Sequence, residues 1–366
     1  MMASASPIRV LRIIPVLDFG GVESLLLTQA THWAAQDIHV DYLTFWKDGH
    51  IADALRAQGA TVHVLGIDPS IRNPKATLAL RKFLKEHPFD ILHSVIGEAN
   101  FHTMLCAPLG KYKVLINEDG IPNRTLRNRI IYAGLYRLVD EIVAVSEASK
   151  DYVEDEEWAP EQRTHLIYNA ISEDFYSVER TRAYTPDHVR FRAIGRLDAV
   201  KNFDGLIQNF AQVAQKYPHI HLDIAGDGPE RANLEAQIHA LQMDERIHIL
   251  GFCDNIPELH QDSDWLLAPS HREGFGLVAA EAMAAGVPVI ASNAGGLPEV
   301  LGDLANKWTF EPTDDAQWIA AIERAATYPA NAYHALRERM RDEAKAFHPT
   351  RYVESLAILY RDVIGT

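Results

Sequence analysis

The stretch "DWLLAPSHREGFGLVAAEAMAAGVPVIAS", residues 264–292, holds one full alternation between the two kinds of secondary structure. The apolar run 265–269 predicts a buried strand, and the alanine-rich run after it predicts a helix that ends at Gly286. A second apolar run, 288–292, predicts another strand. Two strands joined through a helix are parallel strands of a βαβ unit. The stretch therefore predicts an α/β fold.

This alternation runs along the whole chain and falls into two sets. Short runs rich in Val, Ile and Leu predict strands at 10–16, 40–45, 62–65, 91–95, 114–117, 142–146 and 165–168, and again at 191–195, 221–225, 247–250, 265–269 and 288–292. The segment 172–190 between the sets is polar and weakly periodic, so we place a hinge near residue 180. The sequence thus predicts two doubly wound domains, residues 1–180 and 181–349, and a closing amphipathic helix over 350–366.

The composition limits the classes of function. A chain of 366 residues exceeds what one hydrophobic core usually supports, and a net charge of −15 argues against nucleic acid as a partner. No apolar run reaches the ~18 residues that a membrane span requires. The first apolar run carries Arg12 and lacks the cleavage pattern of a signal peptide. We therefore expect a cytoplasmic protein.

The sequence predicts no metal site and no disulfide. Cys106 and Cys253 are the only cysteines, and neither they nor the 17 histidines show metal-ligand spacing. Asp262 and Asp264 form a D-x-D pair, but they precede a predicted strand, whereas a metal-binding pair belongs at the carboxyl end of one. We interpret this pair as the end of a helix.

The loop between the strand and the helix of the opening stretch suits an anion. Gly274 and Gly276 let the backbone approach a ligand closely, and the N–H groups of residues 275–277 lie at a helix N-terminus, which favours diphosphate. Glu273 in the loop and Glu281 in the helix can each accept from two adjacent hydroxyls. A ligand with hydroxyls on both sides of a diphosphate is a nucleotide-sugar.

A dinucleotide site is the rival interpretation, because the same glycines match the G-x-G-x-x-A spacing. That site needs an acidic residue about 20 positions on, at the end of the next strand. This chain has Ser292 and Asn293 there. A plainer alternative is that Glu281 is a surface helix residue and that the glycines only shape a turn.

Three further turns at predicted strand ends supply groups for the same ligand. In "AIGRLDAVKN", residues 193–202, Arg196 and Lys201 lie between a strand and a helix, where two cations can neutralise a departing diphosphate without a metal. Taken singly, each is more often a solvated surface charge. The glycine-rich turns "AGDGPE", 225–230, and "NAGGLPE", 293–299, have the same position between a strand and a helix.

Together these motifs resemble the family-4 retaining glycosyltransferases of GT-B fold, over nearly the whole chain. The resemblance rests on several motifs in the family's order, namely "GGVES", "VDEIVAVSEASKDYV", "IYNAIS", "GRLDAVKN", "GDGPE" and "PSHREGFGLVAAEAMAAGVPVIASNAGGLPEV". It implies two Rossmann-like domains that face each other across a cleft. The first would bind the acceptor and be completed by the helix 350–366, and the second would bind a nucleotide-sugar donor.

The resemblance also implies roles for the matching residues. Those implied to contact the donor are Gly20, Gly21, Arg196, Lys201, Gly226, Glu273, Gly274, Phe275, Gly276, Leu277 and Glu281. Arg196 and Lys201 would hold the donor diphosphate. Glu281 would hold the nucleotide ribose, and Glu273 the transferred sugar. The implied reaction moves this sugar to an acceptor hydroxyl in polysaccharide, lipopolysaccharide or glycolipid synthesis, with no cofactor and no metal.

One position departs from the family's pattern. Where the family often has a histidine after "TE", this chain has "INEDG", which places Asp119 beside the donor sugar. The predicted catalytic residues are Asp119, Glu273, Arg196 and Lys201. His93, at the end of "DILH", and Glu118 are alternative candidates for the sugar contact. A core or surface histidine is the plainer interpretation of His93.

The stretch "IPNRTLRNRIIYAGLYRLV", residues 121–139, carries four arginines and no acid in an otherwise acidic chain. Such an amphipathic basic stretch predicts peripheral contact with an anionic membrane, at its inner face, or with a lipid-linked acceptor. A solvated helix that packs on the sheet is the plainer alternative.

Two other classes of function stay open at this point. One is a GT-B shell that binds a nucleotide-sugar or polysaccharide without turnover, which the departure at Asp119 motivates. The other is a GT-B sugar epimerase, which would share the donor site. The intact set of Arg196, Lys201, Glu273 and Glu281 favours the transferase.

Overall fold

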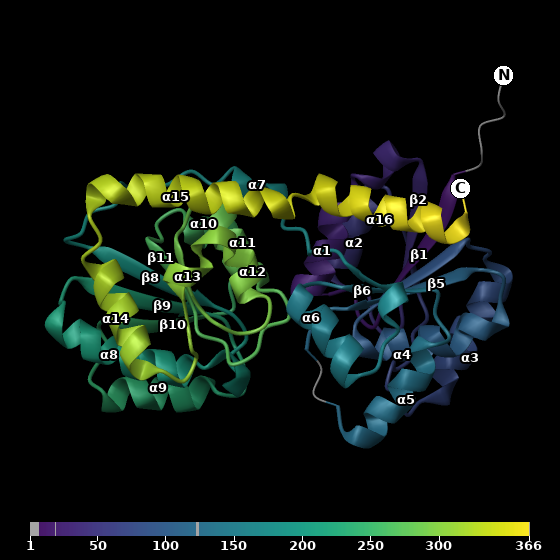
Figure 1. Ribbon diagram of the computed structural model, residues 1–366, viewed down its shortest axis with the longest axis horizontal. Coiled ribbons are helices and arrows are strands. Elements are labelled where there is room, and N and C mark those ends of the chain that lie inside the picture. The colour runs from purple at the N-terminus through teal and green to yellow at the C-terminus, as the bar shows by residue number, and fades with distance from the viewer. Residues whose placement is uncertain (1–6, 19, 122–123, 366) are drawn as a thin grey trace. The chain divides into compact units, whose positions relative to one another are not determined.

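The computed structural model describes residues 7–18, 20–121 and 124–365, and the chain forms two compact units (Figure 1). Unit 1 comprises Met1–Ala170 and His348–Thr366, and unit 2 comprises Ile171–Phe347. Each unit has a parallel sheet with helices on its faces, so the predicted α/β class with two Rossmann-like domains is confirmed.

Unit 1 is built on a seven-stranded sheet in the order β3-β2-β1-β4-β5-β6-β7, and all its strand pairs are parallel. Its strands are β1 (Ile8–Ile14), β2 (Ile38–Thr44), β3 (Thr61–Val64), β4 (Ile91–Val95), β5 (Lys113–Glu118), β6 (Glu141–Ala144) and β7 (Thr164–Leu166). The order reverses between β1 and β4. In such sheets ligands bind at the carboxyl ends of the strands beside this reversal.

Alternate side chains of β1 enter two cores, one on each face of the sheet. Val10 and Ile14 pack in a core with helices α1 (Gly21–Ala30), α2 (His50–Ala57) and α16 (Pro349–Ile364). Leu11 and Ile13 pack in a second core with α3 (Pro74–Glu86), α4 (Gly97–Cys106) and α5 (Leu126–Tyr136). Because both faces are covered, most strand residues are apolar, and polar residues such as Arg12 and His93 that lie within the strands are buried.

The last helix, α16, packs on unit 1 although it follows all of unit 2 in sequence. Tyr352 and Tyr360 are buried, and the ring of Tyr360 stacks on Trp33 at 5.8 Å between centroids. Arg361 donates to the carbonyl of Gln36 at 2.8 Å. The helix therefore completes the core of the first unit.

Unit 2 is built on a six-stranded sheet in the order β10-β9-β8-β11-β12-β13, also parallel throughout. Its strands are β8 (Val189–Ile194), β9 (Ile220–Ala225), β10 (Ile247–Gly251), β11 (Trp265–Ala268), β12 (Val289–Ser292) and β13 (Thr309–Phe310). Its longer helices are α8 (Phe203–Lys216), α9 (Arg231–Ala240), α11 (Leu277–Ala284), α14 (Asp315–Ala326) and α15 (Ala330–Ala344). The twelve predicted strands are all present, with ends within two residues of the prediction, and β13 is the addition.

The hinge predicted near residue 180 lies inside unit 2, whose first residue is Ile171. The short helix α7 (Glu173–Tyr176) is held there because the Tyr176 hydroxyl donates to the carbonyl of Ala344 at 2.7 Å. Arg180 donates to the buried carboxylate of Asp264 at 2.5 Å. The polar residues of the segment 172–190 thus include arginines that form ion pairs within unit 2.

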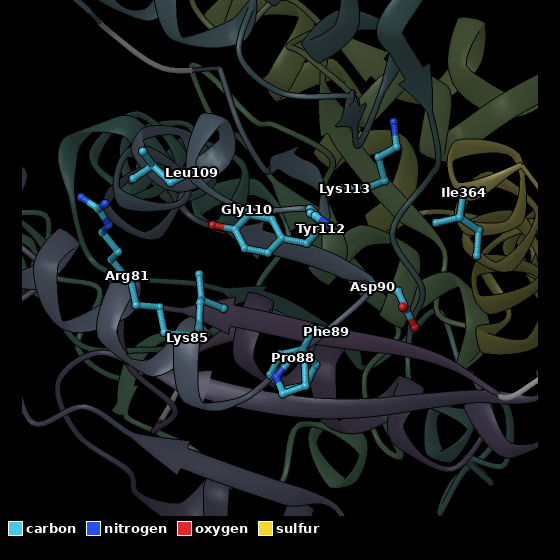
Figure 2. A pocket seen from close by; sticks show the side chains of 12 residues that line it. Arg81, Lys85, Pro88, Phe89, Asp90, Leu109, Gly110, Tyr112, Lys113 and Ile364 are labelled. Atoms are coloured by element: carbon cyan, nitrogen blue, oxygen red, sulfur yellow. The ribbon is translucent and has the colours of Figure 1, made fainter.

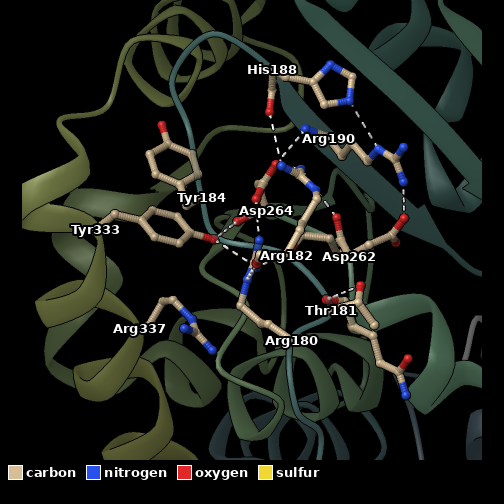
Figure 3. Close-up of polar contacts among 12 residues, drawn as sticks. Arg180, Thr181, Arg182, Tyr184, His188, Arg190, Asp262, Asp264, Tyr333 and Arg337 are labelled. Carbon is tan, nitrogen blue, oxygen red and sulfur yellow. Dashed lines mark hydrogen bonds and ion pairs between the residues drawn. The ribbon is translucent and has the colours of Figure 1, made fainter.

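The D-x-D pair before β11 is the centre of this ion pairing (Figure 3). Asp264 is fully buried and pairs with Arg180 and Arg182, while Asp262 pairs with Arg190 and with Arg192, the latter at 2.7 Å. Four guanidinium groups therefore form ion pairs with the two carboxylates. Within the described residues the pair acts as a structural anchor between β8, β11 and the segment before β8.

Candidate active site

The loop after β8 and the turn after β9 pack directly against each other at the carboxyl edge of the unit 2 sheet. Gly195 donates its N–H to Ala225 at 3.0 Å. A Cβ atom on Gly226 would lie 1.9 Å from the Gly195 carbonyl oxygen, and one on Gly228 would lie 2.3 Å from that of Leu197. These distances are far below van der Waals contact, so the turn after β9 needs glycine at both positions to pack against the loop after β8.

The two predicted cations lie on the loop after β8 in different environments. The Lys201 ammonium pairs with the Glu273 carboxylate at 2.7 Å, and the Ser270 hydroxyl donates to the same carboxylate oxygen at 3.1 Å. Arg196 is 73% exposed, and its Nε lies 3.8 Å from Asp198. Lys201 is therefore positioned by the loop after β11, whereas Arg196 is largely exposed to solvent.

The "GFG" turn before α11 is held by contacts that only glycine permits. Gly276 has φ +106°, and a Cβ there would lie 2.7 Å from a Leu297 methyl group. A Cβ on Gly296 would lie 2.8 Å from the Gly274 carbonyl oxygen. Phe275 is buried, with its ring edge-to-face to Phe347 at 5.1 Å. The turn is thus packed closely against residues 296–297 and Phe347.

Helix α11 begins at Leu277 without a side-chain cap. The N–H groups of Ala279 and Ala280 bond to the Gly276 carbonyl, whereas those of Leu277 and Val278 have no acceptor within the part of the chain that the structure describes. The first turn of a helix with uncapped N–H groups attracts anions. The loop with Lys201 lies beside this turn through the Glu273 contact.

Glu281 lies one turn further into α11 and is partly buried. Burial raises the pKa of its carboxyl group to about 7. It has no hydrogen-bond or ion-pair partner among the described residues, unlike Glu273. A desolvated carboxyl without a partner is costly, so a ligand with hydroxyl donors would satisfy it.

At the carboxyl edge of the unit 1 sheet, Asp119 follows β5 directly. Its carboxylate accepts from the Ile96 N–H at 3.0 Å and from the Asn117 side-chain amide at 3.4 Å. Burial raises the pKa of Asp119 to about 6, an effect that these two donors oppose. Gly20 and Gly21 lie at the same edge, where they form the uncapped N-terminus of α1.

The two alternatives to Asp119 are engaged elsewhere. His93 is fully buried between Tyr360 and Asn117, with 2.6 Å to an atom of each. Glu118 accepts from the Tyr136 hydroxyl at 2.9 Å and pairs with Arg124. Of the three, Asp119 is the one that retains partial exposure. His93 is thus the core histidine of the plainer interpretation.

The predicted basic stretch 121–139 divides into paired and exposed arginines; Pro122 and Asn123 lie outside the described residues. Arg124 pairs with the buried Glu157 at 2.6 Å, and Arg129 pairs with Glu156 at 2.6 Å. Arg127 and Arg137 are exposed. The exposed apolar residues in this stretch are Leu126, Ile130, Ile131 and Leu138.

A pocket of about 540 Å³ lies at the opposite, amino edge of the unit 1 sheet (Figure 2). Four cations line it, namely Arg81, Lys85, Lys111 and Lys113, with Asp90 as a single carboxylate. It contains none of the predicted site residues. It adds positive charge beside the end of α3.

Sequence reasoning missed the groups behind Asp119. Arg12, Asn117 and Tyr360 are buried and meet at His93, yet they lie on three elements far apart in sequence. The available signal was Arg12 itself, a charged residue inside an apolar strand. As for metals, no cluster of three or more His, Cys, Asp or Glu side chains suited to an ion occurs in the described ranges.

Comparison with known proteins gives matches over both units. The Glycosyltransferase Family 4 model matches residues 19–175, and the model of Glycosyl transferases group 1 matches residues 186–347. An uncharacterized glycosyltransferase of Methanocaldococcus jannaschii is 30% identical over 189 residues, which are 48% of each chain. The N-acetyl-alpha-D-glucosaminyl L-malate synthase of Bacillus anthracis is 28% identical over 212 residues, 56% of this chain and 55% of the relative. The chain thus spans about half the length of these two relatives.

The fold is shared with solved structures over their full length. Anabaena HepE, crystallised in complex with UDP and glucose, superposes with a TM-score of 0.82 at 20% identity, covering 97% of this chain and 100% of that one. At this identity the likeness concerns the fold. No helix in the described ranges is both long and apolar enough to span a bilayer.

Proposed function

Because this chain belongs to the group 1, family-4 glycosyltransferases of GT-B fold, we propose that it is a retaining enzyme that moves a sugar from a nucleoside-diphosphate sugar to an acceptor hydroxyl. One observation carries the proposal. At one sheet edge of unit 2, the Lys201–Glu273 pair, an uncapped helix N-terminus and the unpartnered carboxyl of Glu281 meet around the "GFG" turn.

Each group at this edge suits one part of the donor. The N–H groups that open α11 and the cations Arg196 and Lys201 would hold the diphosphate. Glu281 would accept from the ribose hydroxyls, and Glu273 from the transferred sugar. UDP is the first nucleotide to test, because Anabaena HepE binds UDP and glucose.

The reaction breaks the bond between the anomeric carbon and the diphosphate oxygen and forms a bond from that carbon to the acceptor oxygen. The acceptor proton leaves with the departing diphosphate. Without an enzyme nucleophile, both events occur on one face of the sugar, through a transition state with positive charge on the ring. A carboxylate at Asp119 would stabilise this charge, and Lys201 and Arg196 would stabilise the charge on the leaving group.

We further propose that the acceptor is a glycan or a lipid-linked glycan and that unit 1 meets it at an anionic membrane surface, the inner face of the cell membrane. Helices α3 and α5 flank α4 on one face of the sheet (Figure 1). Segments 71–86 and 124–139 together hold nine of the 35 Lys and Arg residues and one of the 50 Asp and Glu residues. Their exposed apolar side chains are Ile71, Leu78, Leu126, Ile130, Ile131 and Leu138. Exposed apolar and cationic groups together suit an anionic bilayer.

The donor half of the proposal is tested with purified protein and a panel of nucleotide-sugars. A matching nucleotide should raise the melting temperature, and with an acceptor present the anomeric configuration of the product, followed by NMR, should equal that of the donor. Inversion of configuration would overturn the retaining mechanism. Binding without transfer to any acceptor of a broad panel would favour the binding shell, and release of a C2-epimeric sugar would favour the epimerase.

The membrane half is tested by sedimentation with vesicles of phosphatidylcholine alone or with phosphatidylglycerol. We expect binding to the anionic vesicles only, and loss of binding in Leu126→Ser/Ile130→Ser. The matched control is Leu250→Ser/Phe252→Ser, two exposed apolar residues of unit 2. Binding that is equal for both vesicles, or that survives the α5 variant, would contradict the proposal.

A further inference from the structure

We infer that a buried chain of hydrogen bonds, from Arg12 and Tyr360 through His93 to Asn117, positions the carboxylate of Asp119 for the reaction. The inference rests on the proposed role of Asp119 beside the donor sugar. The hydrogen-bond chain joins β1, α16, β4 and β5, so it reaches from α16 to the carboxyl edge of the sheet.

The chain begins with a charge that lacks an ion-pair partner. Arg12 lies on β1 and is fully buried, and its Nη1 atom is 3.2 Å from both His93 Nδ1 and the Tyr360 hydroxyl. Its Nε and Nη2 atoms have no hydrogen-bond partner among the described residues. Burying a guanidinium without a carboxylate is expensive. We therefore infer that Arg12 has a role beyond packing.

This charge fixes the proton on His93. A guanidinium has only donors, so His93 Nδ1, which faces Arg12 and the Tyr360 hydroxyl, must accept. The ring proton is then on Nε2 and is donated to Asn117 Oδ1 at 2.6 Å. Burial and the nearby charge of Arg12 hold the pKa of His93 well below its usual value, so the ring stays neutral.

The same logic fixes the amide of Asn117. Because its oxygen accepts from His93, its nitrogen points to Asp119 Oδ1, 3.4 Å away. The other carboxylate oxygen accepts from the N–H of Ile96 at 3.0 Å. Ile96 has φ +68°, a strained conformation for a β-branched residue. Asn117 on β5 and Ile96 after β4 thus each donate a hydrogen bond to Asp119, and the backbone of Ile96 is strained.

The charged groups that act on Asp119 are Glu118 and Arg12, of opposite sign, and Glu118 is itself paired with Arg124. The remaining groups of the chain, His93, Asn117 and Tyr360, are neutral. Loss of the Asn117 donor should therefore raise the pKa of the carboxyl group and lower the fraction that is ionised at neutral pH. Activity should then fall on the acidic side of the pH profile.

Two substitutions of His93 separate positioning from packing. Gln places an N–H donor where Nε2 is and should keep the contact with Asn117, whereas Asn places its polar atoms near Nδ1 and should lose it. We expect His93→Gln to retain kcat within about threefold. We expect His93→Asn to lower kcat about tenfold at pH 6.5, with unchanged donor KM, and to move the acidic limb of the kcat profile to higher pH.

Equal kcat and equal pH profiles for these two variants would overturn the inference. The result is distinguishable from failure of the proposed function, because Asp119→Asn would then still lower kcat. If His93→Asn does not fold, ¹⁵N NMR of the unmodified protein decides the question. A neutral Nε2–H tautomer from pH 5 to 8 supports the inference, and an Nδ1–H tautomer or ordinary titration near pH 6.5 overturns it.

Discussion

Glu281 at the carboxyl edge of the unit 2 sheet and Asp119 at the carboxyl edge of the unit 1 sheet differ in how the protein prepares their carboxyl groups. In unit 2, Glu281 is a partly buried carboxyl without a partner, Arg196 is largely exposed, and the first N–H groups of α11 are uncapped. In unit 1, both oxygens of Asp119 already accept hydrogen bonds from the protein. Groups left unsatisfied are suited to bind a ligand, whereas a group held in advance is suited to act on it. The comparison thus separates donor recognition from the chemical step.

The largest expected effect is that of Lys201→Ala, which removes a cation from the diphosphate side of the site. We expect kcat to fall on the order of a hundred- to a thousandfold, as when one preorganised charge-stabilising group is lost. The matched control is Lys216→Ala, which removes an exposed lysine of α8 that pairs with Glu323. Steady-state kinetics that match the unmodified enzyme would remove Lys201 from the site.

Asp119→Asn should lower kcat by about ten- to a hundredfold with little change in donor KM. The variant keeps the shape and removes the charge, so it should affect an interaction made mainly in the transition state. Asp140→Asn is the control, because Asp140 also accepts two N–H donors but precedes its strand, at the opposite edge. If Asp119→Asn and Asp119→Ala both keep kcat within about threefold, Asp119 is only a loop support.

Glu281→Ala should weaken binding of UDP about tenfold, or ~1.4 kcal/mol, in calorimetric titration. Glu273→Ala should keep UDP affinity and lose discrimination among donor sugars, because Glu273 is assigned to the sugar. Titrations in which the two variants behave alike would reject this division of roles.

The raised pKa of Glu281 also leads us to expect that the stability of the folded protein depends on pH. Its pKa in the folded chain is about 7, above the ordinary 4.5, so the protonated form is favoured by folding. The folded state therefore loses stability as pH rises from about 4.5 through 7, by on the order of 3 kcal/mol at most. Glu281→Gln should melt higher than the unmodified protein at pH 8 and equally at pH 4. A difference that does not depend on pH would contradict the assignment.

The smallest effect should be that of a chelator. Because Arg196 and Lys201 are assigned to the diphosphate charge, EDTA should leave the transfer rate unchanged. Loss of turnover in EDTA that manganese or magnesium restores would count against the cation assignment.

The strand pattern, both glycine-rich turns and the helix start at Leu277 could be predicted from sequence because each depends on local periodicity or turn chemistry. Strand β13 has only two residues, Thr309 and Phe310, and forms no apolar run. The predicted hinge near residue 180 lies within unit 2, in a segment whose arginines neutralise Asp262 and Asp264 but look like solvated linker residues in sequence. The contacts between Arg12, His93 and Asn117 could not be predicted from the sequence, because they depend on the order of the strands in the sheet.

Unit 1 is interrupted in sequence by the whole of unit 2, since its last helix is Pro349–Ile364. During synthesis on the ribosome, unit 2 can emerge as one continuous segment. Unit 1 cannot complete its hydrophobic core until α16 has been synthesised, because Tyr352 and Tyr360 are buried in that core. Until then Arg12 and His93 lack the hydroxyl that joins them. Nascent chains stalled before residue 349 should therefore carry a native-like second unit and a first unit that is still open to proteases.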